Sequence, residues 1–176
     1  YYDAPTGKLY IGNVGGNNTG TSYERLELGA RGANYGWPNC EVGNCGNSTY
    51  TPEIYGYSHG GRDACITAGF VYHGTQYPAS YQGSFFFADY TRKCIWVMFP
   101  DADGNPDPNN RMAWKSAAAG PVDIQTGPNG DIFYVDFDGG TVRRYTYLGP
   151  TALATASPDS GSPPLTVQFD GTGSQP

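Results

Sequence analysis

The chain has 176 residues, of which 26 are glycine and 14 are proline, so its composition argues against an all-helical fold. Aromatic residues make up 15% and charged residues only 15%, which is typical of a folded β-rich protein and excludes a wholly disordered chain. The net charge of −6 argues against nucleic acid as a partner, and no apolar run approaches the roughly 20 residues that span a bilayer.

A glycine followed by a short apolar and aromatic strand occurs three times along the chain. In the second and third copies another strand begins ten residues after the glycine, which predicts a β-hairpin at each. In the first copy a loop rich in Gly, Asn and Thr delays the partner strand. The predicted strand pairs are 7–14 with 23–28, 83–90 with 93–98, and 130–137 with 140–145.

The spacing of this repeat predicts an architecture. Gly7, Gly83 and Gly130 are 76 and 47 residues apart, and a four-stranded propeller blade occupies roughly 40 to 50 residues. The stretch 121–130 indicates a strand and a tight turn leading into the third copy. A β-sandwich also has short strands at regular spacing, but the radial repeat favours a propeller.

The composition changes near residue 150. The segment 151–156 leads into a loop rich in Ser and Pro at 157–164, and an alternating strand follows at 165–169. Two strands and a turn cannot bury a core of their own. We therefore divide the chain into domains at 1–149 and 150–176 and expect the second to be a truncated module.

Five motifs occur in an order and spacing that resembles the soluble quinoprotein glucose/sorbosone dehydrogenase family. The resemblance implies an all-β fold in which residues 1–149 form the last blades of a six-bladed β-propeller. The tail is similar to the first strands of a PKD domain, an immunoglobulin-like sandwich common in exported proteins. The motifs are GANYGWP at 32–38, YGYSHGG at 55–61, ITAGFVY at 66–72, YQGSFFFADY at 81–90 and GPVD at 120–123.

The resemblance also implies cofactors, namely pyrroloquinoline quinone (PQQ) and Ca²⁺. His59 lies in the loop that faces the cofactor end of such a propeller, and Gly15 and Gly16 fall where the family presents backbone carbonyls to its calcium. The family's general base is a His from an earlier blade, so no residue here matches it. Where well-characterised members carry arginines that pair with the quinone, this chain has Gly120 and Pro121.

A second candidate calcium loop lies at 101–107. Asp101, Asp103, Asn105 and Asp107 alternate oxygen-bearing side chains as a calcium-binding loop does. Its glycine stands at the fourth place rather than the sixth, and the twelfth residue is Met112 rather than Glu. A solvated loop between blades is the competing interpretation.

The four cysteines predict disulfides and therefore an oxidising compartment. Of the three pairings that four cysteines permit, we favour Cys40 with Cys45, which closes a small loop, and Cys65 with Cys94, which would join two strands of one blade. Trp37 is expected either to pack between blades or to line the channel mouth.

The sequence thus predicts a piece of a secreted, PQQ-dependent sugar dehydrogenase, with an aldose as the substrate. The alternative is a non-catalytic extracellular propeller that binds glycans or protein partners. The chain opens at Tyr1 without a Met, so we expect an interior piece of a longer protein that is inactive by itself.

Overall fold

The computed structural model describes residues 1–150 and 152–174, so positions 151, 175 and 176 of the predicted second module lie outside the described residues. The chain divides into two compact units, Tyr1–Thr146 and Tyr147–Pro176. The described residues form 13 strands and one short 3-10 helix, Ala79–Tyr81, which confirms the all-β class. No helix among them has the length and apolar character needed to cross a membrane.

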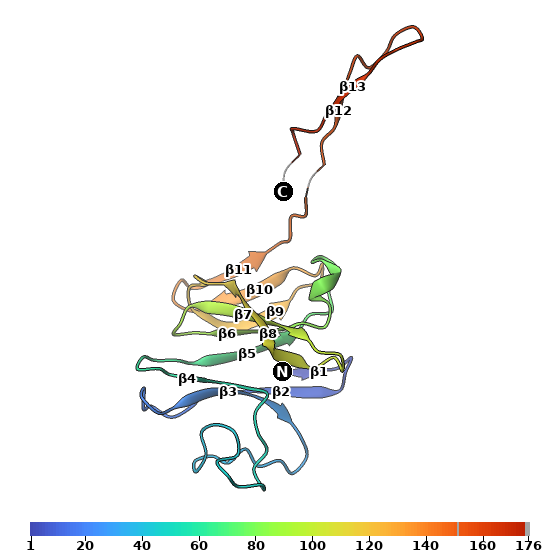
Figure 1. Cartoon of the computed structure of the whole chain (residues 1–176). Coiled ribbons are helices and arrows are strands. Elements are labelled where there is room, and N and C mark those ends of the chain that lie inside the picture. Colours follow the sequence, from blue (N-terminus) through green and yellow to red (C-terminus); the bar gives the residue numbers. More distant parts are fainter. Residues whose placement is uncertain (151, 175–176) are drawn as a thin grey trace. The chain divides into compact units, whose positions relative to one another are not determined.

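The first unit consists of three antiparallel sheets that follow one another in chain order (Figure 1). Two have four strands and the third has three, in the order β11-β10-β9. The first sheet contains β1 (Tyr2–Asp3), β2 (Lys8–Asn13), β3 (Tyr23–Gly29) and β4 (Tyr55–Ser58); the second contains β5 (Ile66–Val71), β6 (Phe85–Asp89), β7 (Cys94–Pro100) and β8 (Pro106–Lys115); the third contains β9 (Pro121–Thr126), β10 (Ile132–Asp136) and β11 (Thr141–Tyr145).

The middle sheet is buried on both faces. Phe85 and Phe87 of β6 belong to the apolar cluster shared with the first sheet, whereas Phe86 and Ala88 belong to the cluster shared with the third. Successive side chains of a strand point to opposite faces, so the unbroken apolar run of β6 covers two neighbours at once. Strand β5 correspondingly contacts both β2 and β9. The middle sheet therefore packs face to face with both of its neighbours.

The three predicted strand pairs are confirmed, with ends that differ by one or two residues. β2 pairs with β3, β6 with β7, and β10 with β11, each antiparallel. In the second and third pairs the strand begins two residues after the repeat glycine, because Gly83 and Gly130 adopt positive φ of 74° and 83° and end the preceding turns. A six-blade count remains a prediction.

The second unit contains one short hairpin. β12 (Thr155–Ser157) pairs with β13 (Gln168–Asp170) in antiparallel register. The strand residues are exposed, and Phe169 is 79% exposed. The identity of this unit as the start of a PKD sandwich, like the domain identities predicted for both ranges, remains a prediction.

One predicted disulfide is present and the other is not. Cys40 and Cys45 are bonded, with Cα atoms 5.8 Å apart. Cys65 and Cys94 are free, which corrects the predicted pairing. Strand β6 lies between them, because Asp89 pairs with Ile66 on one side and with Cys94 on the other. Strands two positions apart are separated by about 9 to 10 Å, beyond the reach of a disulfide. Burial also raises the pKa of the Cys94 thiol to about 12.

Candidate functional site

A hollow of about 340 Å³ lies where three loops of the first and second sheets meet, and we call it the His59 hollow. Its walls come from the β2–β3 loop, the β4–β5 loop and the β6–β7 turn. Gly15, Gly16 and His59, three residues that the sequence singled out separately, therefore share one site. The lining residues are Val14, Gly15, Gly16, Asn17, His59, Asp63, Ala64 and Thr91.

A buried carboxylate, Glu24 of β3, organises this hollow. Glu24 is fully buried, and its Oε1 lies 2.8 Å from His59 Nε2. Oε1 also accepts the N–H of Gly15 at 3.1 Å, and Oε2 accepts the N–H of Ile66 at 2.6 Å. One side chain thus joins two strands and two loops. A buried charge with this many donors is stabilised in place rather than expelled to solvent.

His59 is oriented by the same contact. The ring is 4% exposed, and its backbone N–H donates to Ser22 O at 2.9 Å. An ionised carboxylate can only accept, so Nε2 donates to Glu24 when that carboxyl is ionised. Within the described part of the chain, Nδ1 is buried without a hydrogen-bond partner. The contact with Glu24 thus fixes the position of a ring that lines the hollow.

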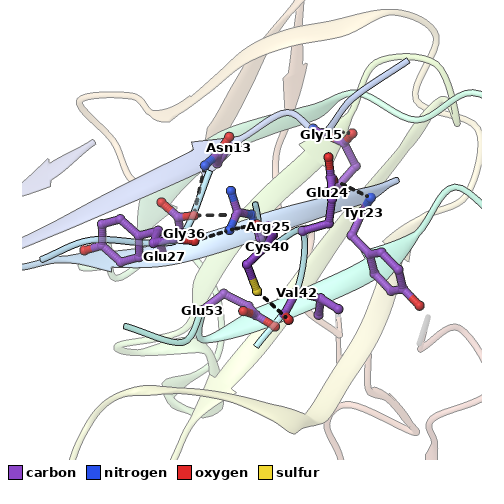
Figure 2. Close-up of polar contacts among 12 residues, drawn as sticks. Asn13, Gly15, Tyr23, Glu24, Arg25, Glu27, Gly36, Cys40, Val42 and Glu53 are labelled. Carbon is purple, nitrogen blue, oxygen red and sulfur yellow. Dashed lines mark hydrogen bonds and ion pairs between the residues drawn. The ribbon is translucent and has the colours of Figure 1, made fainter. Parts of the chain in front are cut away.

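Gly15 has a packing reason to be glycine. A Cβ added there would lie 2.2 Å from Tyr23 O, which is a clash with backbone. A Cβ on Gly16 would meet Ser22 Oγ at 3.0 Å and Glu41 Oε1 at 3.2 Å. The missing side chains allow the β2–β3 loop to fold back on β3 beside Glu24 (Figure 2).

A second buried network includes Thr91, which also lines the hollow. Tyr57 OH donates to Asp89 Oδ2 at 2.8 Å, and Thr91 donates to Asp89 Oδ1 at 2.9 Å. Burial, and next the charge of Asp89, raise the pKa of Tyr57 far above its ordinary value, so its proton stays on the phenol. Arg92 Nη2 holds the carbonyls of Ser58 and His59, at 2.6 and 3.2 Å. The His59 loop is therefore fixed from both sides.

The long loop between β3 and β4 is also fixed, in this case by Arg25. This arginine is 1% exposed, and its Nη1 donates to the carbonyls of Tyr35 and Cys40 at 2.7 and 3.5 Å. Its Nε lies 3.4 Å from Glu27 Oε1, which accepts the Asn13 amide at 2.9 Å (Figure 2). Together with the disulfide, this chain of contacts holds a loop of 25 residues against the first sheet.

The candidate calcium loop at 101–107 does not contribute to the hollow. Asp101 Oδ1 accepts the N–H groups of Asp103 and Asn105 at 2.9 and 2.8 Å. The Asn105 N–H is the main cause that lowers the pKa of Asp101. Lys8 Nζ donates to Asn105 Oδ1 at 2.7 Å. One oxygen of Asp101 and the amide oxygen of Asn105 are thus engaged, the first by the loop itself and the second by a lysine.

Another hollow, of about 620 Å³, is lined by the segments that follow β5 and β9. His73 lies there, with Nε2 2.8 Å from Oδ1 of the buried Asp3. None of the site residues predicted from the sequence lines it. Of the predicted site residues, Gly15, Gly16 and His59 line the His59 hollow, whereas those of 101–107 line neither hollow.

The oxygen atoms that line the His59 hollow are better suited to binding a hard cation such as Ca²⁺ than to binding a polyanion. The side chains of Asn17, Asp63 and Thr91 supply oxygen, and Gly15 and Gly16 line the hollow beside them. Among the described residues no three His, Cys, Asp or Glu side chains gather as a metal centre, so calcium would need backbone and amide oxygens as well. No Arg or Lys lines the hollow in the described chain. The carboxylates of PQQ therefore do not fit these residues.

Comparisons with known proteins bear on the fold. Scans of protein-family models and of curated proteins give no match. Among solved structures, a putative oxidoreductase (glucose dehydrogenase) from Thermus thermophilus matches 82% of this chain at 18% identity, with a TM-score of 0.62. The apo aldose sugar dehydrogenase of Escherichia coli matches 83% at 13% identity and a TM-score of 0.59.

The PQQ-bound aldose sugar dehydrogenase of Streptomyces coelicolor matches 82% of the chain at 17% identity, with a TM-score of 0.56. The chain spans only 43%, 42% and 40% of the lengths of these three proteins. At these identities the likeness shows a dehydrogenase-like fold, which agrees with the resemblance read from the motifs.

Proposed function

We propose that this chain is part of an exported sugar dehydrogenase-like protein with a six-bladed propeller, and that it contributes the sugar-facing and calcium-facing part of the site. The supporting observation is that Gly15, Gly16 and His59 meet in one hollow around the buried carboxylate of Glu24. The Cys40–Cys45 disulfide is in keeping with export.

Within this proposal the chain's residues bind and orient rather than transfer hydride. The imidazole of His59 lines the hollow and would contact a bound sugar, and Glu24 holds this ring in place. Asn17 and Asp63 are placed to bind Ca²⁺ or further hydroxyls. Among the described residues, none that lines the hollow offers a cation to the carboxylates of a quinone, so the proposal assigns that cofactor no contact here.

A second candidate is a non-catalytic exported propeller that binds glycans or protein partners. One observation favours it: no cation lines the hollow in the described residues, and Gly120 and Pro121 stand where the quinoprotein family has arginines. Fold alone does not choose between the two.

Reconstitution of the full-length protein tests the proposal. With Ca²⁺, PQQ and an artificial electron acceptor, we expect turnover of aldoses. His59→Gln, which keeps an amide near Glu24, is expected to raise KM about tenfold with a smaller effect on kcat, since it removes a binding contact. Sugar binding by calorimetry without turnover over a broad panel would support the glycan-binding alternative. Absence of both would overturn the sugar function.

A further inference from the structure

We propose that Trp37 is a stacking platform for the ring of a neutral pyranose at the rim of the His59 hollow. The inference rests on the proposed sugar function and adds to it a specificity contact. It follows from three properties of this residue, namely its exposure on a fixed loop, its position beside the hollow, and the chemistry around it.

Trp37 is 55% exposed, although the backbone on both sides of it is tightly held. Gly36 has φ +86°, and a Cβ there would lie 2.7 Å from the Cβ of Cys40. Gly36 O accepts the N–H of Asn39 at 2.8 Å and that of Cys40 at 2.9 Å, while Arg25 holds the carbonyl of Tyr35. A preorganised exposed aromatic side chain loses little entropy when a ligand packs on it.

The indole lies next to the hollow. A Cβ on Gly16 would be 3.8 Å from Trp37 Cη2, and Gly16 lines the hollow together with Asn17 and His59. A sugar ring that stacks on Trp37 would therefore extend over Gly16, with its hydroxyls toward the polar groups of the hollow. The loop and the hollow then form one binding surface.

The surroundings of Trp37 favour a sugar over an apolar partner. The loop carries the amides of Asn34 and Asn39, and the hydroxyl of Tyr35, two positions before Trp37, donates to Leu28 O. A pyranose has an apolar C–H face and a hydroxyl-bearing edge, which match an exposed indole on a loop that also carries amides. Glu41 and Asp63 nearby disfavour anionic ligands.

The test measures binding directly, without quinone. The full-length protein is titrated with methyl β-D-glucopyranoside and followed by saturation-transfer NMR and calorimetry. We expect Trp37→Ala to weaken binding about tenfold and Trp37→Phe to weaken it less than about threefold, because the smaller ring retains the stacking face. Phe169→Ala, which removes an even more exposed aromatic residue from the second unit, should leave binding unchanged. An unaltered thermal transition in each variant shows that the fold is intact.

Two results would overturn the inference. The first is glucoside binding that is the same in Trp37→Ala as in the parent. The second is Trp37-dependent binding of tetramethylammonium without glucoside binding, which would make the indole a cation site. Turnover with an unchanged KM in Trp37→Ala would remove the platform but keep the dehydrogenase. Trp37-dependent glucoside binding without any turnover would keep the platform and remove the dehydrogenase.

Discussion

Two segments were predicted as calcium sites: the β2–β3 loop at Gly15 and Gly16, and residues 101–107, which run from the β7–β8 loop into β8. The two segments are held in place by different contacts. The first is held from outside itself, since the carboxylate of Glu24 fixes it beside His59. The second is held mainly by local contacts, since Asp101 accepts two N–H groups of its own loop and Lys8 donates to Asn105. The richer set of acidic residues belongs to the segment that forms this local turn.

This contrast shows that an oxygen-rich sequence is not by itself a binding site. A site needs groups that converge from separate segments of the chain, as Gly15, Gly16 and His59 do at the hollow. Local alternation of Asp and Asn is also the signature of a turn that bonds to its own backbone. The predictions below probe each side of this difference.

The largest effect is expected for Glu24→Ala. It would leave a cavity and remove the acceptor for two backbone N–H groups and His59, at a cost of about 3–5 kcal/mol in the free energy of unfolding. Denaturant unfolding measures this cost. Glu24→Gln, which keeps the shape and one acceptor, should lose less. Equal stability of Glu24→Ala and the parent would show that the network does not hold the hollow.

The smallest effect is expected for Asp101→Asn, because an amide oxygen can still accept from Asp103 and Asn105. The native pKa of Asp101 is lowered, so its stabilisation is present above the unfolded value of about 3.9 and is lost as pH falls through the native value. Melting curves of parent and variant should therefore converge in acid and differ slightly at neutral pH. A change in calcium affinity in this variant would restore the loop as a metal site.

The strands were predictable because the signal is local and repeated. The run from Phe85 to Ala88 is apolar at every position, which indicates burial on both faces, and Gly83 marks its start. The predicted Cys65–Cys94 disulfide was wrong because β6 lies between β5 and β7. The spacing of the cysteines along the sequence does not reveal this strand order.

The site was predictable only in part. His59, Gly15 and Gly16 came from motif position, but the residue that joins them, Glu24, was not singled out. A signal for it existed: Glu24, Arg25 and Glu27 place charges on both faces of a strand that is otherwise apolar. Charges at consecutive positions of a buried strand indicate a polar network. Which partners they find depends on contacts between distant loops, which no local pattern contains.

Hydrogen exchange in the presence and absence of Ca²⁺, followed by mass spectrometry on the full-length protein, tests the central claim most directly. We expect calcium to slow exchange in peptides that cover Gly15 to Asn17 and His59 to Asp63, and to leave those that cover 101–107 unchanged. Protection confined to 101–107 would contradict this expectation, because calcium would then bind at the other candidate segment.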